Sequence, residues 1–534
     1  MKEKRRVILF LIILLLLAGV LFSSYCMAFS LHGDEYFSMG FANNTEDFLF
    51  LTQGTIDNYS HDGWLDGTFL KDWLTVKQGE RFSYLSLYRN VRDDVHPPLY
   101  FMVLHTLCSF VPENIEASMI AGYAINMICM MGVLVFLYLI SYQIIKERSL
   151  SLIAPILFMI SNGAMSLTSY VRMYAMLSFL CMLCVFLHIY AKERTKTSFL
   201  TYFLIYGIIA AGGLTHYYFY VMYAVIFVTV IIYLLVQKDY KRVIQYLITV
   251  MCAAVTVILL YPYVFRHLLS SNRGVQATAN LTSFQGSDFF PFLKDILFML
   301  NDSVYSGKFV CYFAVAVILV IMAGISTLKN KGGHGTIGMK QWENAIFVGI
   351  VSIGYLLLLS RISYSSRWPY FSPVFALLML ITGVIFGFSI KRISIPYVKT
   401  AVLGVFLLIL IVTLPGIITE KIGNHQENKA YREKMSAYFS SDVLFFYDDW
   451  NNLYDNEILT LMQDDEICTV STEDALISDY EKILAGRHTK DNLLVYFPVG
   501  YSEEQNIINK LTYIGFTNPQ QIEATNFDIY TLEQ

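Results

Sequence analysis

The feature that most constrains this chain is a series of apolar runs, each near the length of a membrane-spanning helix. About 20 apolar residues are needed to cross the hydrocarbon core of a bilayer as a helix. The first run starts at Val7, and later ones occupy 118–143, 150–166, 168–190, 198–214, 217–237, 243–264, 308–327, 345–361, 370–390 and 399–419. Charged residues make up only 15% of the chain, against roughly 25% in soluble proteins. The sequence therefore predicts an α-helical polytopic membrane protein with roughly eleven transmembrane helices.

Basic segments between the runs predict how the helices are oriented. Lys and Arg gather at 2–6, 146–148, 192–196, 238–242 and 391–392, and again between Lys329 and Lys340. Cytoplasmic loops carry an excess of Lys and Arg, so these segments and the N-terminus are expected in the cytoplasm. A cleaved signal peptide could also begin this way, but the first apolar run is long enough to span. The predicted location is the cell membrane, crossed many times.

The segment from Pro97 to Val111 is apolar but only fifteen residues long, and it opens with two prolines. If it crossed the membrane, all later basic loops would change sides. It is therefore predicted to be a juxtamembrane or re-entrant helix. A compensating extra span near 291–300 is the alternative.

The chain is expected to form two domains. Residues 1–420 form the transmembrane domain, whose first outer loop covers about 30–96. Residues 421–534 change in composition and form an extracytoplasmic α/β domain. Its predicted strands are 442–447, 492–497 and 527–532, and its predicted helices lie around 473–486 and 502–514.

Acidic and titratable residues gather in the predicted outer loop. Asp34 and Glu35 follow the first span, and paired carboxylates can act as a general base or bind a metal. Asp94 and His96 precede two prolines that fix the local backbone. Such a rigid turn suits a lipid-phosphate site at the membrane surface. The alternatives are a solvated loop for the first pair and a simple helix start for the second.

Cationic and aromatic residues recur on the same predicted face. Arg172 and Tyr174 lie near the start of one apolar run, and His216 and Tyr217 lie at the end of another. Arg367 stands in an outer loop against the positive-inside tendency. Guanidinium groups match phosphate oxygens well. Snorkelling of the arginine and an aromatic belt of tyrosines are the alternatives.

In the order of these motifs the chain resembles bacterial membrane glycosyltransferases of the GT-C fold, the superfamily of protein O-mannosyltransferases and aminoarabinose transferases. The motifs are Asp34-Glu35, the run from Asp94 to Tyr100, the run from Arg172 to Ala175, and Thr215-His216-Tyr217. The resemblance covers roughly residues 1–420. It implies transfer of a sugar, with inversion, from a polyprenyl-phosphate donor to an acceptor on the outer face.

The resemblance also implies roles for individual residues. Asp34 becomes the expected base on the acceptor hydroxyl, while Glu35 or Asp94 assists it or holds a divalent metal ion. The sequence does not decide whether a metal is needed. Cations then stabilise the departing lipid phosphate. The expected substrate-binding residues are His96, Arg172, Tyr174, His216, Tyr217 and Arg367.

The expected partners are a lipid-linked sugar, membrane lipid, and an acceptor that is a protein, a lipid or a wall glycan. The net charge of −4 gives no sign of nucleic acid. A transporter or flippase of lipid-linked saccharides is the main alternative, and a structural or sensor protein is a third. Transporters place ionisable groups near the bilayer midplane. Here the acidic residues lie in an outer loop, which favours the enzyme.

Overall fold

The chain forms two compact units in its computed structural model. The first contains residues 1–27, 94–100 and 122–421, and the second contains 28–93, 101–121 and 422–534. The predicted domain boundary near residue 420 lies outside the described residues. The structure describes residues 2–26, 33–45, 63–194, 197–282, 286–329, 338–363, 365–393, 430–431, 433–438, 441–447, 461, 466–485, 492–522 and 527–534.

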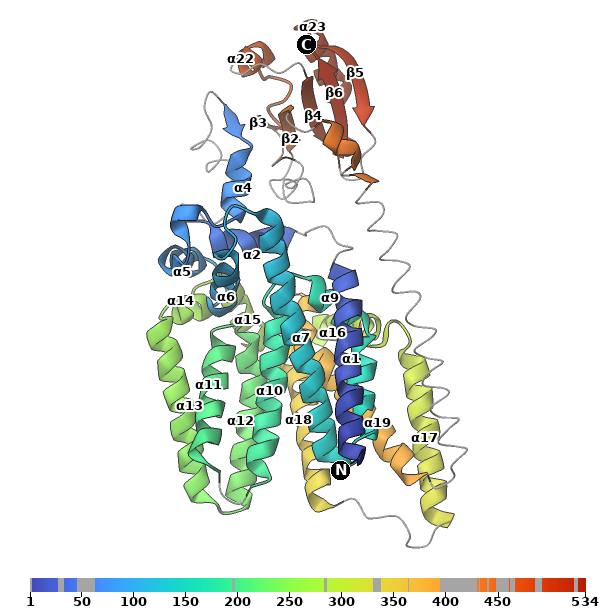
Figure 1. The fold of residues 1–534 in the computed structure, drawn as a ribbon. Coiled ribbons are helices and arrows are strands. Elements are labelled where there is room, and N and C mark those ends of the chain that lie inside the picture. The colour runs from blue at the N-terminus through green and yellow to red at the C-terminus, as the bar shows by residue number, and fades with distance from the viewer. Residues whose placement is uncertain are drawn as a thin grey trace. The chain divides into compact units, whose positions relative to one another are not determined.

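Long helices that run alongside one another make up the first unit (Figure 1). They begin and end at polar or glycine-containing segments, as the hydropathy pattern predicts. The helices are α1 (Lys2–Cys26), most of α7 (Ile115–Ile145), α8 (Ile153–Met159), α9 (Asn162–Ser169), α10 (Tyr174–Lys192), α11 (Phe199–Gly213), α12 (Tyr218–Val236), α13 (Tyr240–Leu260), α14 (Val264–Leu269), α15 (Asn272–Thr282), α16 (Gly286–Tyr305), α17 (Phe309–Lys329), α18 (Met339–Ile362) and α19 (Ser372–Arg392), with the short 3-10 turns η2 (Leu150–Leu152) and η3 (Trp368–Phe371).

Within the described residues, seven helices are long and apolar enough to cross a membrane. An eighth span is formed if α8 and α9, which meet at a 60° bend, count as one broken crossing. Shorter apolar helices cover Ile8–Ser23 and Phe199–Gly213, where two further spans are expected. The predicted span at 399–419 lies outside the described residues. The prediction of a polytopic helical membrane protein is confirmed.

The apolar segment after the two prolines forms α6 (Leu99–Cys108). Ten helical residues extend about 15 Å, half the thickness of a hydrocarbon core. The helix is therefore too short to cross, as the sequence predicts. The alternative span near 291–300 falls in α16, which contains Pro291. α16 is not among the described helices that are long and apolar enough to cross a membrane.

The predicted basic segments meet at one end of the helices. Lys391 Nζ donates to the carbonyl of Ile145 at 2.7 Å, and Lys146 lies 3.5 Å from the carboxylate of Glu193. Arg242 donates to the backbone carbonyl of Arg194 at 2.9 Å. These contacts join four loops that the positive-inside rule assigns to the same side. The assignment of that side to the cytoplasm stays a prediction.

In the second unit, the loop after the first span folds into short helices held by buried amides. They are α2 (Gly33–Asn43), α4 (Thr68–Leu74), η1 (Gln78–Glu80), α5 (Tyr84–Asp93) and α6. Asn43 donates to the carbonyl of Leu74 at 2.8 Å, and Asn90 donates to that of Asn44 at 2.6 Å. The ring of Trp73 lies where a side chain on Gly40 would otherwise stand. The compact helical fold of this loop was not predicted.

The C-terminal region contributes a mixed sheet, which joins six described strands in the order β1-β3-β2-β4-β6-β5. The central strands β3, β2 and β4 are parallel, and β1, β6 and β5 are antiparallel to their neighbours. The strands are β1 (Trp64–Asp66), β2 (Asp442–Tyr447), β3 (Glu466–Ser471), β4 (Asn492–Pro498), β5 (Thr517–Ile522) and β6 (Phe527–Glu533). β1 comes from the first loop and extends the sheet by pairing with β3.

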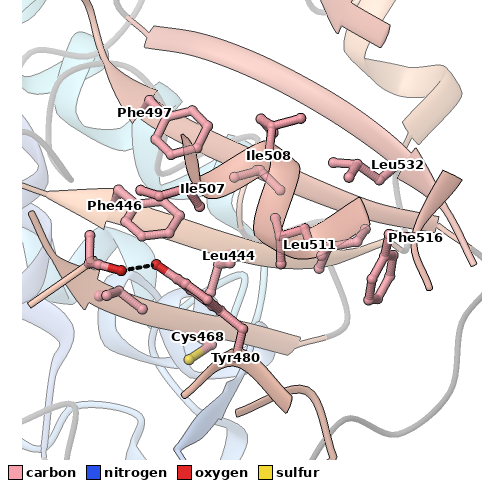
Figure 2. Close-up of a cluster of buried hydrophobic side chains, with 14 of the residues drawn as sticks. Leu444, Phe446, Cys468, Tyr480, Phe497, Ile507, Ile508, Leu511, Phe516 and Leu532 are labelled. Carbon is pink, nitrogen blue, oxygen red and sulfur yellow. Dashed lines mark hydrogen bonds between the residues drawn. The ribbon is translucent and has the colours of Figure 1, made fainter. Parts of the chain in front are cut away.

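The sequence predicts β2, β4 and β6 correctly, and it also predicts α23 (Glu504–Tyr513). The helix expected around 473–486 is shorter and covers only α22 (Tyr480–Ala485). Figure 2 shows that side chains of the sheet and of these two helices share one apolar core. Phe446 and Phe497 stack at its centre, 4.8 Å apart between ring centroids. This core makes the small α/β fold expected for the tail.

Replacing Phe446 by Ala should destabilise this core by about 3–5 kcal/mol, because a fully buried ring is lost and a cavity is left. Pulse proteolysis of the purified protein in denaturant would measure the change. The matched control is Tyr513→Ala, since Tyr513 is 89% exposed; that change should stay within about 0.5 kcal/mol. Equal protease resistance of the Phe446 variant and the wild type would contradict the packing described.

Candidate functional site

The Pro97-Pro98 turn is fixed to the end of α11 by one backbone hydrogen bond. Leu99 carries the first N–H after the two prolines, and it donates to the carbonyl of Leu214 at 2.9 Å. Carbonyls at a helix C-terminus have no partner within the helix, so this bond satisfies one of them. The bond brings His96, just before the prolines, to His216, just after α11. The centroids of the two imidazole rings lie 5.7 Å apart.

Asp94 holds the ring of His96 in one orientation. The Nδ1 atom of His96 lies 2.6 Å from Oδ2 of Asp94, and the two side chains are 4% and 10% exposed. Burial alone would raise the pKa of Asp94, but the adjacent His96 and Arg172 lower it to about 2. The carboxylate therefore accepts the Nδ1 proton. Since burial lowers the pKa of His96, the ring is neutral and its Nε2 is an acceptor.

His216 has the opposite tautomer. Its Nδ1 accepts the backbone N–H of Tyr218 at 3.0 Å, which leaves the proton on Nε2. Burial, together with the nearby His96, Arg273 and Arg172, holds the pKa of His216 well below its usual range. Two neutral imidazoles thus stand side by side, one with an acceptor nitrogen and the other with a donor.

Two glycines allow the chain to turn tightly before His216. A side chain on Gly212 would lie 2.4 Å from the ring of Phe219, and one on Gly213 would lie 2.2 Å from the hydroxyl of Tyr220. Because both positions lack a side chain, the start of α12 packs directly against the end of α11. The His216 loop is held between these two helix ends.

Two guanidinium groups place positive charge beside the imidazoles. Arg172 lies between α9 and α10 and is only 5% exposed. Arg273, in the first turn of α15, is exposed at the rim. The charges of both act on His96 and His216 and lower the pKa of each ring. This concentration of positive charge favours an anionic ligand.

Aromatic rings surround His216 on the side of α10 and η3. The ring of Tyr174 lies 5.5 Å from His216 and 6.1 Å from Tyr370, and Tyr218 lies 4.8 Å from His216. The order of these residues along the chain does not reveal that they meet. They form a rigid wall behind the imidazole and restrict its orientation.

A cavity of about 640 Å³ opens beside these groups. Its polar end is formed by His96, His216, Tyr217, His267 and Arg273. The hydroxyl of Tyr217 is 2.8 Å from Nδ1 of His267, so this pair closes one side. Most of the remaining lining is apolar and comes from α11–α15: Ile209, Val221, Val250, Ala254, Val257, Ile258, Val264, Phe265, Leu268, Leu269, Ala277 and Leu281. The other hydroxyl-bearing side chains in the lining are Tyr218, Tyr220, Tyr223, Ser271, Thr278 and Tyr370.

The apolar part of the cavity opens among exposed side chains. Phe265, Leu269 and Leu281 are 52%, 70% and 51% exposed, although they are hydrophobic and belong to helices next to the membrane-spanning α13. The cavity therefore has a polar, positively charged end and an apolar part that opens among exposed hydrophobic side chains.

Some of the predicted site residues line the cavity and others do not. His96, His216 and Tyr217 line the cavity, while Arg172 and Tyr174 lie next to those that do. Arg367 is exposed at the start of η3 and is not among the lining residues.

Asp34 and Glu35 belong to the second unit, where they occupy the first turn of α2. Carboxylates are favoured at a helix N-terminus, and Glu35 is only 4% exposed. The catalytic roles expected of Asp34 and Glu35 stay predictions.

Sequence reasoning did not single out Arg273 and His267. Both stand in a stretch rich in polar residues that reads as a solvated loop. The structure shows two short helices there. Gly274 lets α15 approach α14 closely, since a side chain on it would lie 2.4 Å from the carbonyl of Leu268. The glycine next to Arg273 was the one local sign of this packing.

In the described parts of the chain, no three His, Cys, Asp or Glu side chains gather so as to hold a metal ion. The polar end contains the neutral imidazoles of His96 and His216 and the guanidinium of Arg273, and the nearby Asp94 is engaged with His96. A guanidinium matches the oxygens of a phosphate.

Comparisons with known proteins gave structural similarities only. No protein-family model matches the chain. No curated protein matches it either. The chain is similar to the crystal structure of ArnT from Cupriavidus metallidurans bound to undecaprenyl phosphate, with 9% identity, a TM-score of 0.49 and 98% of each chain covered. It is also similar to the oligosaccharyltransferase of Archaeoglobus fulgidus, with 10% identity, a TM-score of 0.44, and 91% of this chain and 69% of that one covered.

Replacing Asp94 by Asn should destabilise the protein in a pH-dependent manner. The carboxylate has a folded pKa of about 2, below its ordinary value of 3.8, so its stabilisation is present above about pH 4 and is lost as the pH falls towards 2. The wild type should exceed the variant by about 2 kcal/mol at pH 7 and by roughly half of that at pH 3. Thermal unfolding in detergent at both pH values checks this. A difference that does not change with pH would contradict an ionised Asp94 carboxylate that donates no proton and accepts the Nδ1–H of His96.

Proposed function

We propose that this chain transfers a sugar from a polyprenyl-phosphate donor to an acceptor hydroxyl at the membrane surface. The observation that carries the proposal is the two-part cavity. It joins guanidinium and imidazole groups to an apolar part that opens among exposed hydrophobic side chains. The substrate that matches both parts is a long apolar chain ending in a phosphate. The resemblance of the sequence motifs to GT-C glycosyltransferases supports the same class of substrate.

The polar end suits a phosphate that becomes more negative during reaction. In the proposed step, the acceptor oxygen forms a bond to the anomeric carbon as the bond from that carbon to the phosphate oxygen breaks. The acceptor proton passes to a base, and the electron pair of the broken bond stays on the polyprenyl phosphate. Arg172 and Arg273 favour the extra charge, and Nε2–H of His216 can donate to an oxygen. No general acid is then needed.

By the sequence resemblance the base is Asp34, in the first turn of α2, with Glu35 beside it. Asp94 has a different role, because its carboxylate accepts a hydrogen bond from His96. We assign it the positioning of that ring, whose Nε2 then accepts a hydrogen bond from the sugar.

Binding of the lipid phosphate to the cavity can be tested without knowing the identity of the sugar. Undecaprenyl phosphate is the probe, and its affinity for the purified protein can be measured by a fluorescence-quench titration. Arg273→Gln should weaken binding about tenfold, which equals about 1.4 kcal/mol. Arg266→Gln is the matched control, because Arg266 is exposed close by but does not line the cavity. Equal losses in both variants would point to a non-specific charge effect and contradict the site.

The proposed role of Asp34 as the base is tested by measuring enzymatic turnover. Sugar release from a radiolabelled polyprenyl-phosphate donor should occur with the wild type and fall by at least about 100-fold in Asp34→Asn, because general-base catalysis contributes about 10²–10⁴-fold. Donor affinity should be unchanged. Full activity in Asp34→Asn would remove Asp34 as the base. Donor movement across vesicles without turnover would favour a transporter.

A further inference from the structure

A second cavity, of about 260 Å³, lies at the opposite end of α12 and α13 from the first. The first cavity uses the start of α12 and the end of α13. The second uses Thr229 to Leu234, near the end of α12, together with Arg242 and Tyr246, near the start of α13. It also takes residues from α10 and α18. It lies beside the basic loops that the sequence places in the cytoplasm.

A nearly buried ammonium group stands in this cavity. The side chain of Lys192 is 10% exposed, and its Nζ lies over the rings of Tyr233 and Phe347 at 5.4 and 5.7 Å. The carboxylate of Glu343 is 3.9 Å from Nζ, beyond hydrogen-bond distance. Among the described residues, Nζ of Lys192 makes no hydrogen bond. Since an ammonium has three donors, an anionic oxygen in the cavity would satisfy it better than the present surroundings do.

Arg242 adds a second, fixed cation. Its Nε donates to Asp239 at 2.6 Å, and its side chain is 15% exposed. A further nitrogen donates to the carbonyl of Arg194 at 2.9 Å. These bonds hold the guanidinium at the cavity wall before any ligand arrives, which lowers the entropy lost on binding.

Part of the cavity lining is apolar and exposed. Ile232 on α12 is 56% exposed, and Ile346 and Ile350 on α18 are 57% and 46% exposed. Both helices are long and apolar enough to cross a membrane, so the three side chains would face acyl chains in a bilayer. The cavity is smaller than the roughly 300–1,000 Å³ of sites that enclose a whole drug-sized ligand. It has room for a headgroup whose chains remain outside.

A chain of buried hydrogen bonds separates this cavity from the first. The hydroxyl of Tyr223, which lines the first cavity, donates to that of Tyr246 at 2.9 Å. Tyr246 in turn lies 3.0 Å from Nε2 of His188, and Nδ1 of His188 lies 2.7 Å from the carbonyl of Cys184. Every member is satisfied, so the wall between the cavities is rigid. The two cavities are distinct sites.

We propose that the second cavity binds the headgroup phosphate of an anionic glycerophospholipid from the leaflet on the side of the basic loops. Lys192 and Arg242 hold the phosphate, and the acyl chains lie along the exposed isoleucines. Basic pockets between membrane helices are suited to such headgroups. This proposal does not depend on the sugar transfer proposed above, because it uses other residues at the other end of the helices.

Native mass spectrometry of the full-length protein in detergent tests it directly. Phosphatidylglycerol should bind about tenfold more tightly than phosphatidylcholine. The double variant Lys192→Gln with Glu343→Gln removes the ammonium without leaving the carboxylate alone. It should lower affinity for phosphatidylglycerol about tenfold. Thr229→Trp, which fills the cavity, should do the same. Lys238→Gln is the matched control, since Lys238 is an exposed lysine of the adjacent loop.

The thermal unfolding temperature of each variant shows that it is folded. Undecaprenyl phosphate and inorganic phosphate serve as competitors. If either displaces phosphatidylglycerol at equal concentration, the site is not selective for a glycerophospholipid and the proposal fails. Unchanged phosphatidylglycerol binding in either cavity variant, or equal binding of the two phospholipids, would also overturn it.

Discussion

The arrangement of the candidate site depends on the hydrogen bond from Leu99 to the carbonyl of Leu214. The two prolines before Leu99 have no N–H of their own, so this bond is the first that the backbone can make after the turn. It links two segments more than a hundred residues apart. With that link in place, Asp94 and His96 lie beside His216, and the polar end of the cavity is complete on that side.

Burial then sets the protonation states of His96 and His216. An imidazole surrounded by protein loses its charge readily, and the guanidiniums of Arg172 and Arg273 make a further positive charge unfavourable. The histidines therefore act as neutral hydrogen-bonding groups, and their tautomers are set by Asp94 and by the backbone of Tyr218. Arg172 and Arg273 supply the fixed positive charge. A site of this kind binds an anion strongly when the rest of the ligand is apolar and excludes water.

Much of this could be read from the sequence, because apolar runs and proline turns are local signals. The spans, α6 and the strands β2, β4 and β6 all follow from hydropathy along a short segment. β5 was missed since Thr517–Ile522 is polar and holds a proline, and β1 was missed because its partner strand lies 400 residues away. His96, Arg172 and His216 stood out at the ends of apolar runs. Arg273 and His267 did not, because only the packing of α14 and α15 brings them to the cavity.

A structure of the protein with undecaprenyl phosphate, determined by electron cryomicroscopy in a lipid nanodisc, would test the central claim most directly. The account predicts density for the phosphate within hydrogen-bond distance of His216 Nε2 and near Arg273. The prenyl chain should follow the apolar lining of α11–α15. A phosphate bound elsewhere, or a cavity that stays empty at saturating lipid, would contradict it.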